Sequence, residues 1–209
     1  MINKYFVKIL LIIVVILCYG CQVVEPIKRL KESSDPYHGS SYKLEFDKWT
    51  REARVYMGLD VKLIASATFK SSQFRDAYSI EYIRLHKLTG AEKEKFAKDQ
   101  KKAAAAYNDF VLAAYVPDKK WNDFSKKDSI WKIYLTVGEN KRLKPVEIRK
   151  IKKVNAVTCH FFPFISPWKS VYLVRFPVDD KSIGGSVSDI KLTIASVFGC
   201  TEMVWNENR

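Results

Sequence analysis

The sequence is poor in the residues that build metal centres. It has three histidines among 209 residues, His38, His86 and His160, and no two of them have the spacing that puts two ligands on one helical face. After residue 43 there is no Cys-x-x-Cys, no His-Glu-x-x-His, no Gly-x-Ser-x-Gly elbow and no glycine-rich phosphate loop. The sequence thus gives no support for a zinc site, a serine nucleophile or a nucleotide site, and we expect no metal and no cofactor.

Carboxylates that could perform acid–base chemistry are also few and scattered. The loop aspartates are Asp118, Asp123, Asp128, Asp179 and Asp180. A pair of them could line a glycosidase-like cleft, yet nothing in their spacing brings two together, and aspartates between strands ordinarily form turns. We therefore expect no catalytic residues. A hydrolase of the cell envelope that acts on peptidoglycan or glycans remains the alternative.

Acidic residues are outnumbered by basic ones, 23 against 36, which gives a formal net charge of +13. The densest charge lies between residues 141 and 153, where seven basic residues accompany one glutamate: Lys141, Arg142, Lys144, Arg149, Lys150, Lys152 and Lys153. One interpretation is contact with lipid head groups or an acidic partner. The other is protection of an edge strand, because lysines and Pro145 prevent sheet-to-sheet aggregation.

The N-terminus has the form of an export signal. An unbroken aliphatic run from Ile9 to Leu17 follows Lys4 and Lys8 and precedes Gly20. A positive front, a short apolar core and a small residue at the boundary are typical of such a signal. The run is shorter than the about 20 apolar residues that a membrane span needs.

Because Cys21 follows Gly20, this N-terminus resembles the signal of bacterial lipoproteins. The resemblance implies that the signal is cut before Cys21, that this cysteine is diacylated, and that the new amino terminus is often acylated as well. The family prefers leucine three residues before the cysteine, whereas here Cys18 stands there and Leu17 lies one place further out. By family custom Gln22, in place of aspartate, implies the outer membrane, facing the periplasm, in a Gram-negative cell.

The resemblance covers the signal alone and divides the chain into three parts. Residues 1–20 are the signal, residues 21–43 form a polar tether broken by prolines, a glycine and serines, and residues 44–209 form one folded domain. An exported protein rarely meets nucleic acid, so the basic charge predicts an anionic lipid or an envelope protein as partner.

The periodicity of the domain predicts a mainly β fold with one helical insertion. Two helices are expected over about 72–108, the first capped by Ser71 or Ser72 and the second opened by a capping box from Thr89 to Glu92. Apolar residues alternate, or run uninterrupted, in eight other segments: 53–55, 61–69, 110–116, 131–137, 146–148, 157–162, 171–176 and 190–197. The predicted fold is an antiparallel β-sandwich of immunoglobulin-like architecture, with a β-barrel as the alternative.

Two further features bear on sites in the domain. Cys159 and Cys200 are expected to form a disulfide, because an exported chain folds where disulfides persist; the alternative is two buried free thiols. The stretch from His160 to Trp168 is the richest in aromatic residues. Phe164 and Trp168 flank its prolines and are the candidate partner contacts, unless the stretch is a core strand.

These features together predict a membrane-anchored lipoprotein of the cell envelope. Its domain would act as a non-enzymatic binding or assembly module. A carrier that holds an apolar ligand between the sheets and the helices is a further alternative.

Overall fold

The computed structural model describes residues 41–138, 141–178 and 190–206. The predicted signal, Cys21 and most of the predicted tether lie outside these residues, as do Asp179 and Asp180. Residues Leu44–Arg209 form one compact unit. Among the described helices, none has the length and apolar character needed to cross a bilayer.

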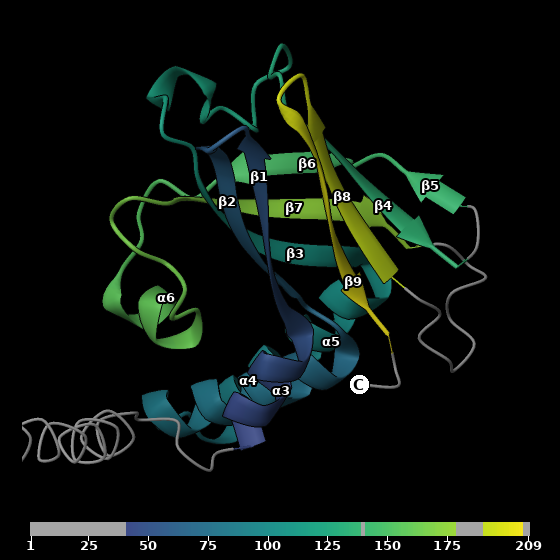
Figure 1. The fold of residues 1–209 in the computed structure, drawn as a ribbon. Coiled ribbons are helices and arrows are strands. Elements are labelled where there is room, and N and C mark those ends of the chain that lie inside the picture. Colours follow the sequence, from purple (N-terminus) through teal and green to yellow (C-terminus); the bar gives the residue numbers. More distant parts are fainter. Residues whose placement is uncertain (1–40, 139–140, 179–189, 207–209) are drawn as a thin grey trace, which may run out of the picture. The chain divides into compact units, whose positions relative to one another are not determined.

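The described strands form two antiparallel sheets (Figure 1). The five-stranded sheet has the order β1-β2-β3-β7-β6, and the four-stranded sheet has the order β5-β4-β8-β9. The strands are β1 (Thr50–Met57), β2 (Asp60–Phe69), β3 (Tyr107–Tyr115), β4 (Lys132–Val137), β5 (Lys141–Leu143), β6 (Glu147–Lys150), β7 (Ser170–Pro177), β8 (Ile190–Ser196) and β9 (Gly199–Trp205). The predicted β-sandwich with helices between two early strands is confirmed, and the pairings of the described strands do not close into a barrel.

Aromatic rings fill the core between the sheets. Phe69 on β2 stacks on Phe110 of β3, with ring centroids 4.9 Å apart, and Trp205 of β9 lies 5.4 Å from Phe110. All three side chains are almost fully buried. Since an aromatic side chain buries about 150–250 Å², this cluster is a main source of the hydrophobic stabilisation that holds the two sheets together.

The sheets also approach closely along β1 and β9. The indole N–H of Trp205 donates to the carbonyl oxygen of Trp49 at 2.9 Å, and Arg51 Nε donates to the carbonyl oxygen of Val204 at 2.9 Å. Gly199 has φ of +134°, and a Cβ there would lie 3.1 Å from Val55 Cγ1. A glycine at the start of β9 is therefore needed both for its backbone angle and for the space.

The helices are α3 (Ser41–Trp49), α4 (Ser72–His86), α5 (Gly90–Ala106), α6 (Ala156–Phe161) and the 3₁₀ turn η2 (Lys119–Trp121). Ser71 caps α4 as predicted, since its Oγ accepts from the Phe74 amide at 3.1 Å. Thr89 precedes α5 as predicted, but its side chain makes no capping hydrogen bond. Gly90 has φ of +50°, which turns the backbone away from the path that a capping box requires.

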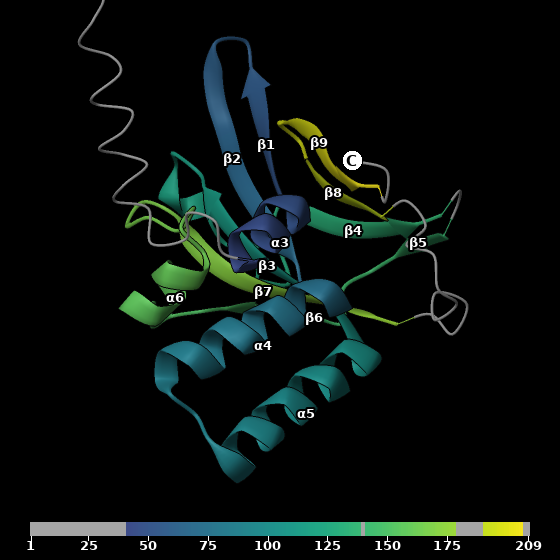
Figure 2. The ribbon, with the colours of Figure 1, turned by 90° about the horizontal axis from the view of Figure 1, so that it is seen from below.

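A buried ionic network docks the helical insertion on the five-stranded sheet. Asp109 on β3 accepts from Arg75 Nη2 of α4 at 2.7 Å and from Arg175 Nε of β7 at 2.8 Å. Arg175 Nη1 also reaches Glu147 Oε2 of β6 at 3.1 Å. The side chains of Arg75 and Asp109 are each only 3% exposed. Figure 2 shows α4 between α5 and the sheets, so this network holds the inner helix.

We predict that Asp109→Asn destabilises the protein by about 3–5 kcal/mol, because it leaves the buried Arg75 without a carboxylate and removes one of the two carboxylates that Arg175 contacts. The measurement is the free energy of unfolding in urea. The matched control is Glu202→Gln, which removes the exposed ion pair between Glu202 and Lys191, 3.2 Å apart, and should cost no more than about 1 kcal/mol. Equal losses in the two variants would mean that the network does not stabilise the fold.

Lys70, which follows β2, makes stability depend on pH. Burial, and then the charge of Arg75, lower the pKa of Lys70 from 10.5 to about 8. Between these pH values the unfolded chain binds more protons than the folded one, so this group makes stability rise with pH. Lys70→Met should therefore gain about 1–3 kcal/mol in the free energy of unfolding at pH 7, with a smaller gain at pH 9.5. A gain that is absent at pH 7, or that grows with pH, would contradict this assignment.

Candidate functional site

The edge strand β6 and its neighbour β7 are joined by a long connection that contains the end of the basic stretch and the whole aromatic stretch. The ladder continues one hydrogen bond past β6, where the Ile151 amide donates to the Val171 carbonyl oxygen at 2.8 Å. The chain then leaves the sheet, forms α6 and returns at Ser170. The last basic residues and the aromatic stretch are therefore the outgoing and returning arms of one connection.

The segment 157–162 was predicted as a strand, and this prediction is wrong, because α6 occupies most of it. Asn155 Oδ1 accepts from the Thr158 amide and hydroxyl, both at 2.9 Å, and so starts the helix. Phe161 packs 4.5 Å from Tyr78 of α4 and is 1% exposed. Burial of this ring against α4 outweighs the strand-like alternation of the sequence.

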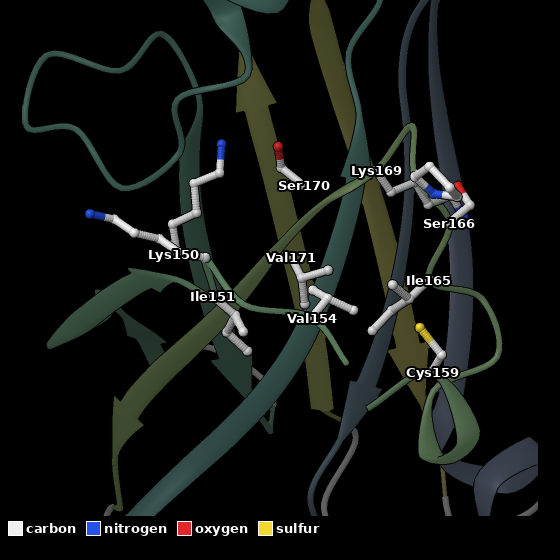
Figure 3. Close-up of a pocket in the computed structure, with 11 residues that line it drawn as sticks. Lys150, Ile151, Val154, Cys159, Ile165, Ser166, Lys169, Ser170 and Val171 are labelled. Atoms are coloured by element: carbon white, nitrogen blue, oxygen red, sulfur yellow. The ribbon is translucent and has the colours of Figure 1, made fainter. Parts of the chain in front are cut away.

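A pocket of about 390 Å³ lies between the two arms of this connection (Figure 3). All of its lining comes from one stretch of chain: Lys150, Ile151, Lys152, Val154, Cys159, Ile165, Ser166, Pro167, Lys169, Ser170 and Val171. The predicted polyanion contacts Lys150 and Lys152 are thus brought beside the aromatic stretch. Most of the returning arm was not predicted to belong to a site, although Pro163 and Pro167 are the sequence signal for a loop there.

The pocket has a polar side and an apolar side. Lys150 pairs with Tyr172 in the ladder, so Ser170, two residues away on β7, has its side chain on the same face as Lys150. In Figure 3 the hydroxyl of Ser170 points up. Ile151 and Val171 point to the other side, where Val154 and Ile165 also lie, and the thiol of Cys159 points toward Ile165.

No carboxylate is among the residues that line the pocket. In the described part of the chain, Lys150, Lys152 and Lys153 form no ion pair, and the Lys150 ammonium lies 5.9 Å from the Tyr172 ring centroid. Lys169 donates to Ser66 Oγ at 3.0 Å, and burial lowers the pKa of its ammonium. Ser66 Oγ in turn donates to Glu52 Oε2 at 3.4 Å, so a carboxylate lies near Lys169, and the positive charge of the pocket comes mainly from Lys150 and Lys152.

The remaining basic residues of the predicted stretch lie elsewhere or are paired. Lys141 and Arg142 belong to β5, the edge of the other sheet, and the Arg142 guanidinium lies 3.5 Å from the Tyr134 ring centroid. Lys144 is exposed in the link between the sheets. Arg149 Nε pairs with Glu147 Oε1 at 3.0 Å. Since β5 and β6 are both edge strands, edge protection fits these lysines and arginines well.

The two candidate aromatic contacts differ in exposure. Trp168 is 78% exposed, as a partner contact requires. Phe164 is half-buried and stacks on Phe46 of α3, with centroids 5.9 Å apart. The prediction that Phe164 is exposed is therefore wrong, because the returning arm folds back on α3.

The predicted disulfide is not formed, and Cys159 and Cys200 are exposed free thiols. The reason is topological. Cys159 lies on α6 in the connection of the five-stranded sheet, whereas Cys200 lies on β9 in the four-stranded sheet. The alternative, two buried thiols, is also wrong because both are exposed.

Of the three loop aspartates within the described residues, Asp118 and Asp123 have local structural partners. Asp118 Oδ1 accepts from the Lys120 amide at 3.2 Å and caps η2. Asp123 Oδ1 accepts from the Ser129 hydroxyl at 3.1 Å, and Asp128 is exposed. Among these described ranges no group of histidine, cysteine and acidic side chains gathers in a way that could hold a metal ion.

No family model and no curated protein matches this chain. Among solved structures, the chain is similar to a crystal structure described as a novel protein of unknown function from Burkholderia pseudomallei. The two are 10% identical, the match covers 84% of each chain, and the TM-score is 0.39. A likeness this distant supports no inference about function, so the pocket itself is the basis for one.

The charge of the pocket predicts how its thiol reacts. Cys159 lines the same pocket as three lysines, so negatively charged iodoacetate should alkylate it faster, relative to neutral iodoacetamide, than it alkylates Cys200. We expect the iodoacetate-to-iodoacetamide rate ratio to be about three- to tenfold larger at Cys159 in low salt, and to fall as salt screens the lysines. Peptide mass spectrometry measures both sites in one sample. Equal ratios at the two cysteines would exclude a positive pocket.

Proposed function

We propose that this chain is a lipid-anchored protein of the cell envelope whose folded body is a non-enzymatic module that binds anionic surfaces. Cys21 carries the lipid, and Gly20 and the apolar run before it support this role. The cations that follow β6 contact phospholipid head groups or an acidic envelope partner. Gln22 after the lipidated cysteine supports the outer membrane, facing the periplasm, as the location in a Gram-negative cell.

The observation that carries the proposal is the group of lysines around one pocket that contains no carboxylate. Lys150 and Lys152 approach it from the outgoing arm and Lys169 from the returning arm. Edge protection accounts for lysines on β6, but it does not require cations from both arms to surround the same hollow. A surface of this kind favours an anionic partner, with about 1 kcal/mol for each cation close to a charged membrane.

The exposed aromatic ring beside the pocket supports a membrane or partner surface. Trp168 stands between two lining residues, Pro167 and Lys169, and is 78% exposed. Tryptophan is favoured where an apolar region meets a wet, polar one, because its indole combines a large apolar ring with an N–H donor. An anchored body that turns this surface toward the bilayer would place the ring and the lysines at the same interface.

The lipid anchor is tested by labelling cells that express the chain with radioactive or clickable palmitate. The unchanged chain should be labelled and should partition into detergent with the membranes. Cys21→Ser should lose the label, whereas Cys159→Ser should keep it, since Cys159 lies in the folded body. Label that persists in Cys21→Ser would contradict the anchor.

The binding surface is tested on vesicles with a chain that begins at Gln22, so that neither the apolar signal nor the lipid is present. Binding to phosphatidylglycerol vesicles at low salt should exceed binding to phosphatidylcholine vesicles. Neutralising Lys150, Lys152 and Lys153 with glutamine should weaken binding to the anionic vesicles about a hundredfold, from about 1 kcal/mol per cation. The matched control replaces Lys98, Lys101 and Lys102, which are exposed on α5. If both triple variants lose the same affinity, the effect is net charge and the proposed surface is wrong.

A further inference from the structure

The pocket combines two chemistries that a flat charged surface does not need. Its polar side holds Lys150 and Ser170, Lys152 also lines it, and its apolar side is formed by aliphatic side chains of both arms, Ile151, Val154, Ile165 and Val171. Of these, Ile151 and Ile165 are half-buried and Val154 is 39% exposed. Apolar side chains left partly open beside ammonium groups that form no ion pair with a described residue favour a ligand that is itself part anion and part hydrocarbon.

We infer that the pocket binds a phosphate group on a short apolar stem, with the phosphate at Lys150, Lys152 and Ser170 and the stem along the aliphatic side toward Cys159. This inference rests on the proposed function and names the chemistry that its site recognises. The same ligand chemistry occurs in an anionic membrane lipid and in a soluble phosphate ester.

The polar side suits a phosphate for three reasons. Lysine ammonium groups bind phosphate as point charges through charge-assisted hydrogen bonds. Two ammonium groups balance the charge of nearly −2 that a phosphate monoester carries near pH 7. The Ser170 hydroxyl, on the same face as Lys150, interacts with the Tyr172 hydroxyl and would turn from it to donate to the phosphate, and no lining carboxylate repels the anion.

The apolar side sets the length and direction of the stem. Val171 is buried and belongs to β7, and Ile165 stands on the returning arm near Cys159 (Figure 3). A stem on these side chains lies against the Cys159 thiol. A volume of about 390 Å³ is at the small end of ligand pockets, which span about 300–1,000 Å³, so a head group with a short stem fits.

The test uses Cys159 as a reporter and Cys200 as its internal control, in the full chain held in an uncharged detergent. The alkylation rate of each thiol with iodoacetamide is followed by peptide mass spectrometry. Hexyl phosphate should slow the alkylation of Cys159 at least about fivefold, because its stem covers that thiol. The alkylation rate of Cys200 should stay unchanged. Inorganic phosphate should bind the lysines without covering Cys159, and hexanol lacks the anion that would hold it in the pocket. Neither compound should therefore slow the alkylation of Cys159.

Variants assign the two ends of the ligand. Replacing Lys150 and Lys152 with methionine should raise the hexyl phosphate concentration needed for protection at least about tenfold, as expected for lost charge-assisted hydrogen bonds. These side chains are exposed, so the fold should persist, and urea unfolding checks it. The matched control replaces Lys98 and Lys101 of α5 with methionine. In this variant, hexyl phosphate should protect Cys159 at the same concentration as in the unchanged chain.

The outcomes separate this inference from the proposed function. Protection of Cys159 by phosphatidylglycerol vesicles, and not by phosphatidylcholine vesicles, identifies a membrane lipid as the source; protection by hexyl phosphate alone identifies a soluble ester. No protection by hexyl phosphate, equal protection of Cys200, equal protection by hexanol, or protection that survives loss of both lysines would overturn the inference. Vesicle binding that depends on the lysines would in those cases leave the proposed function standing.

Discussion

The end of the β6–β7 ladder is the constraint on which the candidate site depends. The hydrogen bond from the Ile151 amide to the Val171 carbonyl oxygen is the last that joins the two strands at this end. β6 is an edge strand, and none of the described strands pairs with its other side. The chain must therefore leave the sheet and return to the same place. The two arms of this connection enclose the pocket, and the lysines lie there because β6 ends there.

The buried network around Asp109 keeps these strands and the helices in register. Arg175 joins β7 to Asp109 of β3 and to Glu147 of β6, while Arg75 brings α4 to the same carboxylate. The aromatic face of α4 then receives Phe161 of α6. A buried network of this kind stabilises little compared with well-packed apolar residues, but it is costly to break, so it fixes where α6 and the pocket can form.

The sequence predicted most of the elements because their apolar periodicity agrees with their final environment. The strand from Val61 to Phe69 and the cap at Ser71 are examples. The segment 157–162 was wrongly predicted as a strand because its apolar residues alternate as in a strand. It forms a helix because Phe161 packs on α4, a contact with residues far away in the sequence. The sequence alone shows the charge of Lys150 and Lys152. That the chain brings Lys169 and Ser170 back to the same pocket depends on the topology of the sheet, which apolar periodicity does not reveal.

The most direct test of the account is a titration of the lysines themselves. Reductive methylation with ¹³C-formaldehyde gives each lysine an NMR signal, and single substitutions assign the signals. On addition of hexyl phosphate, the signals of Lys150 and Lys152 should shift together in a saturable way, while those of Lys98 and Lys101 on α5 stay in place. Small shifts of equal size at all four lysines, without saturation, would contradict a pocket that selects an anion.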